Sequence, residues 1–564
     1  MSDVIPASDN SLINPFVPQE FVAAMLHGKG RQDNPFQIYT SDDFEFLRLY
    51  RSSCFMIMND IDFAGVDFSP IGSGQEVFCG KLYGDGKTLK NLTVEPDENI
   101  FNIGLFSVTS NAQIASITID ESCVIIGRDE TDYDAVISGC TGSLVGLANG
   151  GSIEYCVNKG TVKGYSITGG LVGASIGASF RNCKNEGQLV VFNSGCYCGG
   201  IAGGVIQGSL IDCKNTADLT VDSDYIAGIT AEVELGNIVN CINTGNITGY
   251  ESVCGIVYEF YTGEIKNCKN SGKITGNSYV SGIAYETDNA TVTECVNTGD
   301  VRVMDARYGY AYVSGIVAST YKTTVYKCCN KGNVTVDSGD CTSGIVAYAG
   351  YGSLIDSCYN SGIISGQSYV GGILAKLNYE QDITIKRCYN TGNVSGSSYV
   401  GGIAGYLEHL TDGSVNNCYN IADVSGSNYV GGIIGYCYYT HLLLENCYFR
   451  GNVNRTSGSN SYFAAILGYY YGYYSGASLG ASCFSTTDTK VLGTPLTTST
   501  DLMAQMSGTV VKSNNYVFDV AQLSSQGYDT VIKGTPWYEG STWNNEEVWK
   551  YYPDKLPELK NMPE

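Results

Sequence analysis

The sequence predicts an all-β fold, a parallel β-helix solenoid of about 12 or more coils with N- and C-terminal caps. Two periodic markers predict it. The first, Cys-x-Asn-x-Gly-x-(Val/Ile/Leu), recurs at intervals of 27 to 36 residues from Cys156 to Cys483. The second motif recurs with the same period and reads TGGLVG, CGGIAG, YVSGIA or YVGGIA. The 70 glycines and the low charged fraction of 16% also fit a solenoid, in which each repeat packs only on its neighbours.

Each repeat is predicted to be a coil of strands. The repeats are rich in Gly, Asn, Ser, Thr and Val, which are poor helix formers, and they show no helical spacing of apolar residues. Short alternating stretches such as GNVSGSSYVGGIAGY are bounded by Gly and Asn turns. Three short strands and three turns therefore fill one repeat, and successive coils stack about 4.8 Å apart.

The repeated cysteine is expected to point inward and to form a column of buried thiols. Parallel side chains in one column rarely reach the dihedral angle of a disulfide, so we expect these thiols to be reduced. The ladder cysteines are Cys156, Cys183, Cys213, Cys241, Cys268, Cys295, Cys328, Cys358, Cys388 and Cys418.

The repeated asparagine is expected to form a hydrogen-bonded ladder at a turn, because Asn tolerates left-handed backbone and can bond its neighbour's amide. The Gly two residues later is expected to supply a positive φ. The ladder asparagines are Asn158, Asn185, Asn215, Asn243, Asn270, Asn297, Asn330, Asn360, Asn390 and Asn420.

The ends of the chain differ from the middle. We predict an N-terminal arm over residues 1–27, an N-terminal cap with the first coils over 28–150, repeats over 151–485 and a Trp/Tyr-rich C-terminal cap over 486–564. All 3 tryptophans lie in the last of these segments. An aromatic cap there would cover the open edge of the solenoid, which otherwise invites aggregation.

Several segments resemble GLUG-repeat bacterial surface proteins of the adhesin-like kind. They are NPFQIYTSDDFEFL, DIDFAG, SPIGS, KLYGDGKTLKNLTV, GLFS, the YVGGIAGY repeats and the tail WNNEEVWKYYPDKLPELK. The resemblance covers nearly the whole chain. It implies a right-handed parallel β-helix with a surface or adhesive role, and it carries over no catalytic residues.

The charge balance limits the partners. With 32 basic and 56 acidic residues the net charge is −24, which argues against nucleic acid and against an anionic membrane surface. No run of 18 apolar residues is present, so we expect no membrane insertion. A signal peptide is not visible. The resemblance favours a cell-surface or secreted protein, with a phage, virion or cytoplasmic location as the alternative.

No catalytic set or cofactor site is predicted. The sequence has no P-loop or HExxH motif, and no CxxC pair for zinc. The acidity leaves room for Ca²⁺, but nothing in the sequence selects it. Acidic pairs such as Asp222 with Asp224 and Asp337 with Asp340, and Asp305 with Arg307, are read as solvated turns.

The number of tyrosines is larger than folding requires, with 43 Tyr against 18 Phe. Tyrosines that recur in phase with the repeat are expected to stack between coils. The insertion GYYYGYYSG is instead predicted to be a binding loop, because insertions map to loops and tyrosine suits sugars and protein surfaces. The candidate binding residues are Tyr469, Tyr470, Tyr471, Tyr473 and Tyr474.

Three functions stay open. The favoured one is a non-catalytic binding protein that recognises a glycan or protein on a host-cell or bacterial surface through a rigid rod. A structural filament or phage component is the second, and self-assembly through residues 1–27 would favour it. A β-helix carbohydrate-active enzyme is the third, and it would require carboxylates lining one face.

Overall fold

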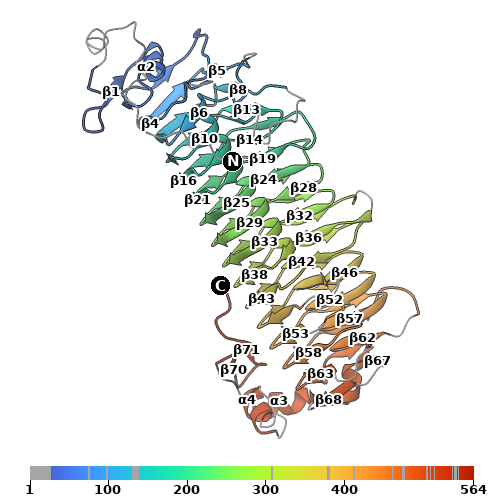
Figure 1. The fold of residues 1–564 in the computed structure, drawn as a ribbon. Helices are drawn as coiled ribbons and strands as arrows, with labels where there is room; N and C mark the ends of the chain where they lie inside the picture. Colours follow the sequence, from blue (N-terminus) through green and yellow to red (C-terminus); the bar gives the residue numbers. More distant parts are fainter. Residues whose placement is uncertain are drawn as a thin grey trace. The chain divides into compact units, whose positions relative to one another are not determined.

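The computed structural model is an all-β protein, with 50% strand and 5% helix, in which a parallel β-solenoid makes about 14 turns (Figure 1). The predicted fold class is confirmed. Two compact units, Met1–Ala217 and Asp218–Glu564, are described separately below. The residues that the structure describes are 27–73, 76–96, 99–129, 139–306, 309–377, 382–410, 413–459, 462–472, 477–503, 506–507, 510–513, 515–535, 538, 543, 545 and 547–563. Of the predicted N-terminal arm, only His27 is among them.

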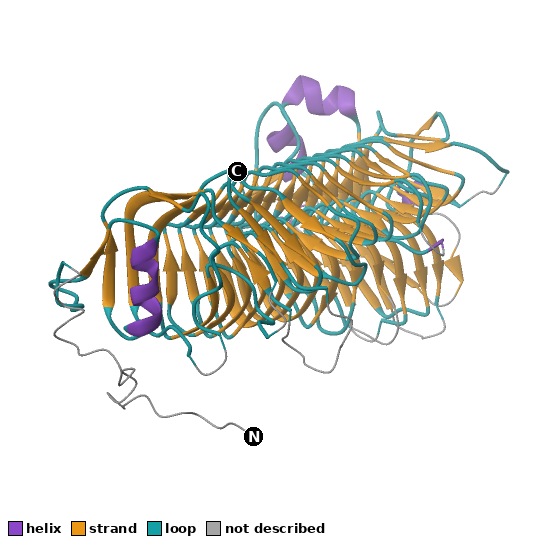
Figure 2. Cartoon of the chain, turned by 90° about the horizontal axis from the view of Figure 1, so that it is seen from above, coloured by secondary structure: helices purple, strands orange, loops and turns teal. Residues whose placement is uncertain are grey.

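The described part of unit 1 begins with strand β1 (Phe36–Ile38), which is followed by the 3₁₀ turn η1 (Asp42–Phe44) and the short helix α2 (Glu45–Leu49), drawn in purple near one end of the strand layers in Figure 2. Phe36, Phe55, Phe78 and Phe106 then form a chain of ring contacts 4.7 to 6.4 Å apart through the first coils. Parallel strands follow on three faces. The face strands are β5 (Thr93–Val94), β8 (Val124–Ile126), β13 (Thr161–Gly164) and β18 (Leu189–Val191) on one face; β9 (Thr141–Gly142), β14 (Thr168–Gly169) and β19 (Tyr197–Gly199) on another; and β10 (Val145–Asn149), β15 (Val172–Ile176) and β20 (Ala202–Ile206) on the third.

Unit 2 repeats one coil pattern many times. A representative coil contains β46 (Ser368–Gly371), β47 (Leu374–Leu377), β48 (Thr384–Lys386), β49 (Tyr389–Asn390) and β50 (Val394–Ser395). Each strand pairs in parallel with its counterpart one coil later; for example, Val370 pairs with Val400, which pairs with Val430. Alternate residues point inward, so the valines and isoleucines of neighbouring coils form continuous buried columns.

The asparagine side chains form a ladder within each unit. In unit 2, Asn297 Nδ2 donates to Asn330 Oδ1 at 2.8 Å, and Asn330 Nδ2 donates to Asn360 Oδ1 at 2.7 Å. Each amide also donates to the carbonyl of the residue two positions on, as Asn330 does to Gly332 at 2.7 Å. These side chains are fully buried, and the ladder therefore satisfies polar groups that would otherwise be costly to bury.

The glycine two residues after each ladder asparagine has a different role from the one expected. Its φ is not positive in the repeats of unit 2. A Cβ at Gly299 or Gly332 would instead overlap the carbonyl oxygen of the matching glycine in the preceding coil. Close approach between coils, rather than a left-handed turn, requires glycine at this position.

Left-handed backbone occurs elsewhere in each coil, at the residue immediately before the ladder cysteine. Asn267, Glu294, Lys327 and Arg387 have φ values of 50°, 56°, 52° and 54°. One left-handed residue makes the corner between two strands. Because Asn tolerates this conformation best among non-glycine residues, its frequent use at this corner (Asn182, Asn240, Asn267, Asn417, Asn446) has a direct physical cause.

All 22 cysteines are free thiols, and Cys79 is the exposed one. The ladder cysteines lie in the interior, where Cys358 and Cys388 are fully buried. Burial away from water raises the pKa of both thiols well above the ordinary value. These two thiols therefore stay protonated at neutral pH and pack as small apolar side chains.

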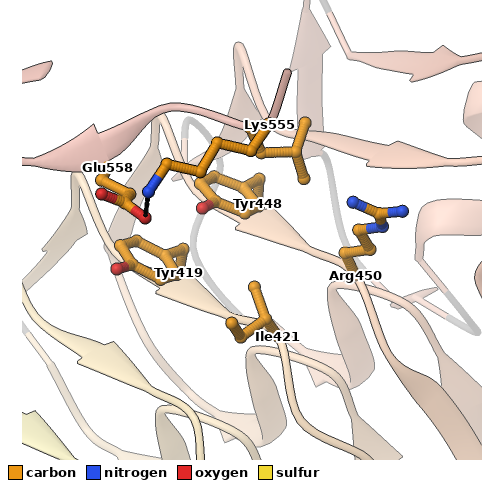
Figure 3. A pocket seen from close by; sticks show the side chains of 7 residues that line it. Tyr419, Ile421, Tyr448, Arg450, Lys555 and Glu558 are labelled. Atoms are coloured by element: carbon orange, nitrogen blue, oxygen red, sulfur yellow. Dashed lines mark hydrogen bonds and ion pairs between the residues drawn. The ribbon is translucent and has the colours of Figure 1, made fainter. Parts of the chain in front are cut away.

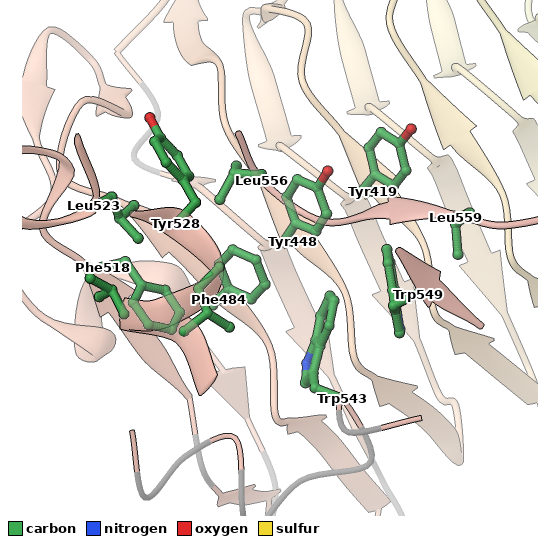
Figure 4. Packing of buried hydrophobic residues seen from close by; sticks show 12 residues of the cluster. Tyr419, Tyr448, Phe484, Phe518, Leu523, Tyr528, Trp543, Trp549, Leu556 and Leu559 are labelled. Atoms are coloured by element: carbon green, nitrogen blue, oxygen red, sulfur yellow. The ribbon is translucent and has the colours of Figure 1, made fainter. Parts of the chain in front are cut away.

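An aromatic cap closes the last coils of unit 2 (Figure 4). It contains α3 (Val520–Gln526), α4 (Tyr528–Lys533) and the antiparallel pair β70 (Trp549–Lys550) and β71 (Glu558–Leu559). Trp543 and Trp549 are fully buried, with ring centroids 4.3 Å apart. Trp543 Nε1 donates to the Ser482 carbonyl at 2.6 Å, and Trp549 Nε1 donates to Asn417 Oδ1 at 3.2 Å, so both indoles are satisfied.

We predict that Asn330→Ala destabilises the protein by about 2–4 kcal/mol, because it removes three hydrogen bonds and leaves buried partners on both neighbouring coils incompletely satisfied. Urea unfolding followed by circular dichroism measures the change. Asn393→Ala is the control, since Asn393 is exposed and the hydrogen bond that it accepts from Asp423 N, at 3.2 Å, is open to water, so the free energy of unfolding should change by less than about 0.5 kcal/mol. Equal effects of the two substitutions would contradict a stabilising ladder.

Candidate functional site

A strip of tyrosines runs along unit 2 where two strand series meet. One column comes from β46, β51 (Ser398–Gly401) and β56 (Asn428–Gly431) and from the residue before β61 (Phe463–Ala464). The other comes from β52 (Ala404–Glu408), β57 (Ile434–Tyr438) and β62 (Leu467–Tyr471). We call these residues the tyrosine strip: Tyr369, Tyr399, Tyr429 and Tyr462 in the first column, and Tyr406, Tyr436 and Tyr469 in the second.

The rings stack within each column and meet edge to face between columns. Tyr399 lies 5.0 Å from Tyr369 and 5.1 Å from Tyr429, with nearly parallel rings. It also meets Tyr406 and Tyr436 at 5.2 Å each, nearly perpendicular. Each ring of the strip is half-buried. Since both faces of Tyr399 are covered by neighbours, its exposed part is the ring edge and the hydroxyl.

Three strip tyrosines hold left-handed backbone, with φ values of 52° at Tyr369, 56° at Tyr399 and 53° at Tyr429. For a bulky residue this conformation costs about 1–2 kcal/mol. The stacked and perpendicular ring contacts, at about 0.5–1.5 kcal/mol each, offset that cost. Partial burial raises the pKa of Tyr369 to about 12, so its hydroxyl stays protonated and can donate hydrogen bonds at neutral pH.

Three glutamates occupy the same register position as the second tyrosine column, further toward the start of unit 2. We call Glu232, Glu259 and Glu286 the glutamate ladder. They pair in sequence along β25 (Thr230–Val239), β29 (Val257–Lys266) and β33 (Ala284–Thr293). The same position continues through Ser319, Tyr348 and Lys376 to Tyr406. One line of residues thus changes from acidic to aromatic along unit 2.

Burial governs the ionisation of the glutamate ladder. Loss of hydration raises the pKa of all three carboxyls, and the neighbouring Glu259 charge adds to the effect at Glu232 and Glu286. Hydrogen bonds from Tyr258 and Tyr261 partly oppose the rise at Glu259. The ladder therefore concentrates negative charge that water solvates poorly.

Sequence reasoning missed this ladder, although a signal was present. The segments TAEVELG, VYEFYTG and AYETDNA carry a glutamate at intervals of 27 residues, in phase with the repeat. The acidic pairs predicted to be solvated turns lie at other positions, each pair within a single turn of the chain. Of those pairs, Asp337 forms an ion pair with Arg302 at 2.8 Å, and Arg307 lies outside the described residues.

The candidate residues of the GYYYGYYSG insertion divide among different environments. Tyr469, Tyr470 and Tyr471 belong to strand β62 rather than to a loop. Tyr469 is part of the tyrosine strip, and Tyr471 is exposed and stacks on Tyr438 at 5.5 Å. Tyr470 points inward, where its hydroxyl donates to the Thr440 carbonyl at 2.8 Å, so it is not part of the candidate surface. Tyr473 and Tyr474 lie outside the described residues.

A pocket of about 310 Å³ lies beside the aromatic cap (Figure 3). Strands β54 (Tyr419–Asn420) and β59 (Tyr448–Phe449), with the residues after them, form one wall, and the returning C-terminal chain forms the other. We call it the cap pocket, and its lining residues are Tyr419, Ile421, Tyr448, Arg450, Lys555, Leu556 and Glu558.

Within the described part of the chain, no group of three His, Cys, Asp or Glu side chains is arranged to hold a metal ion. No helix in that part is long and apolar enough to span a membrane.

Comparison with known proteins gives limited likenesses. No family model matches the sequence. Halomucin from Haloquadratum walsbyi is 27% identical over 163 residues, an alignment that covers 27% of this chain and 2% of Halomucin. The crystal structure of a candidate immunoglobulin A1 protease from Bacteroides ovatus aligns over 94% of both chains, with 15% identity and a TM-score of 0.21. A structural likeness at that level carries no argument about function.

We predict that Glu259→Gln stabilises the protein at pH 7. The folded-state pKa of Glu259 lies above the unfolded value, which is about 4.3. The stability associated with this group is therefore present below about pH 4.3 and is lost as the pH rises through the folded pKa. The melting temperature of the variant should exceed that of the wild type at pH 7, and the gap should close near pH 4.

Glu234→Gln is the matched control, because Glu234 lies on the neighbouring strand β25, two residues after Glu232, and is exposed. It should leave the melting temperature nearly unchanged at both pH values. A Glu259→Gln variant that is less stable than the wild type at pH 7 would show that the charged carboxylate stabilises the fold, contrary to the pKa direction.

Proposed function

We propose that this chain is a non-catalytic binding protein that recognises a glycan or protein on a cell surface through the tyrosine strip. The observation that carries the proposal is the strip itself, with seven half-exposed tyrosines in two columns. Tyrosine presents a large amphipathic surface at low entropic cost, which suits recognition of polar partners. The stacked coils hold the hydroxyls at fixed spacing, and such preorganisation favours binding.

We propose a cell-surface or secreted location. The resemblance of the DIDFAG, SPIGS and YVGGIAGY segments to GLUG-repeat proteins supports it. The likeness to Halomucin gives weak further support. The net charge of −24 favours solubility and disfavours binding to nucleic acid.

One observation favours a carbohydrate-active enzyme as a second candidate. The glutamate ladder places carboxyls on successive coils, about 4.8 Å apart at the backbone, and raises their pKa values. Retaining glycosidases use two carboxyls about 5–5.5 Å apart. Release of new reducing ends from a bound polysaccharide would favour this candidate over pure binding.

The test of the binding proposal is a glycan-array and whole-cell binding assay with a variant in which Tyr399, Tyr429, Tyr436 and Tyr469 are changed to Phe. The substitution keeps ring stacking but removes the exposed hydroxyls. Each lost hydrogen bond contributes about 0.5–1.5 kcal/mol, so affinity should fall at least about tenfold.

A control variant changes Tyr310, Tyr321 and Tyr351 to Phe, because these tyrosines are exposed outside the strip. It should bind like the wild type. If the strip variant and the control both keep full affinity, the ligand is held elsewhere, and if the wild type binds nothing on arrays or cells, the recognition role is wrong.

A further inference from the structure

The residues that line the cap pocket carry a formal charge of +1, whereas the chain carries −24. Its lining contains two cationic side chains, Arg450 and Lys555, and one carboxylate, Glu558, in a protein with a net charge of −24. Figure 3 shows Arg450 on one side of the pocket, the two tyrosines on the other and Ile421 between them. Cationic side chains in a hollow of an acidic protein favour an anionic ligand where they keep donors that their ion-pair partners do not use.

The cationic groups are held in place by partners. Asp488, which is not part of the lining, binds Arg450 through Nε at 3.0 Å and Nη2 at 2.9 Å. Glu558 binds Lys555 Nζ at 2.5 Å. A guanidinium has five N–H donors in a planar fork, so an Arg fixed by a carboxylate outside the pocket can still present donors to a ligand inside it.

The walls of the pocket are rigid. Tyr419 and Tyr448 stack at 4.8 Å, and Trp549 covers them at 6.3 and 6.1 Å. The Tyr448 hydroxyl donates to the Pro557 carbonyl at 2.8 Å, which ties the returning chain to the coils. These contacts fix both walls before any ligand arrives, and such preorganisation lowers the entropic cost of binding.

Size and lining narrow the chemistry of the ligand. A volume of about 310 Å³ is at the small end of ligand pockets and suits a single ring. Ile421 is 45% exposed and offers an apolar contact for C–H groups. Glu558 can accept hydrogen bonds from hydroxyls.

We propose that the cap pocket binds a carboxylate-bearing sugar ring, with the carboxylate on Arg450, hydroxyls on the Lys555–Glu558 ion pair and a C–H face against Ile421. This site is separate from the tyrosine strip and does not depend on the function proposed for the strip. It gives the protein a second point of recognition with selectivity for acidic sugars.

Isothermal titration with D-glucuronic acid tests the proposal, beside D-glucose, inorganic phosphate and N-acetylalanine. Glucuronate should bind, and glucose should bind at least about tenfold more weakly, because it lacks the charge-assisted hydrogen bonds. Phosphate binding as tightly as glucuronate would reduce the pocket to a general anion site and overturn the sugar proposal. If N-acetylalanine bound more tightly than glucuronate, the ligand of the pocket would be a peptide carboxylate, which would also overturn the sugar proposal.

Lys555→Gln should weaken glucuronate binding at least about fivefold, while Lys550→Gln, at an exposed lysine outside the pocket, should leave it unchanged. Lys555 is close to half exposed, so its loss should not impair folding, which circular dichroism checks. Ile421→Trp should block the pocket. The strip variant serves as a further control and should still bind glucuronate. Undiminished binding by both Lys555→Gln and Ile421→Trp would overturn the site.

Discussion

The asparagine ladder is the interaction on which the rest of unit 2 depends. From Asn243 to Asn390, each buried amide donates to the next asparagine and to a nearby carbonyl, so it fixes the register of two coils at once. The second motif serves the same contact. A Cβ at Gly282 or Gly315 would overlap the side chain of Asn297 or Asn330. The Cys-x-Asn-x-Gly and Gly-Gly motifs are therefore two sides of one packed interface, which explains why they share a period.

Because the register between coils is fixed, residues at the same position of successive coils form a continuous row along the surface. The position of Glu232 becomes aromatic by Tyr406, and the strand ahead of it supplies the other tyrosine column. The tyrosines accept left-handed backbone there because their rings gain contacts on several sides. Recognition chemistry can thus vary along the protein while the interior columns stay constant, as expected when each repeat packs only on its neighbours.

The sequence was enough to predict the fold, because period, composition and the inward cysteine each follow from local chemistry. The site was less predictable. Tyr470 points inward because the insertion continues a strand, and this depends on pairing with Cys437 in the preceding coil. The left-handed residue precedes the cysteine rather than being the asparagine, since the corner geometry is set by stacked coils. The cap pocket is lined by residues far apart in the sequence, such as Ile421 and Glu558. They lie together because the C-terminal segment folds back onto the coils, which the sequence pattern does not indicate.

A double-mutant cycle on Asn297 and Asn330 tests the central role of the ladder most directly. The two side chains share one hydrogen bond, so the double alanine variant should lose less stability than the sum of the single variants, by about 1 kcal/mol. Asn243 and Asn390 lie several coils apart on the same ladder, and their effects should add within about 0.5 kcal/mol. Full additivity for Asn297 and Asn330 would contradict a ladder that couples neighbouring coils.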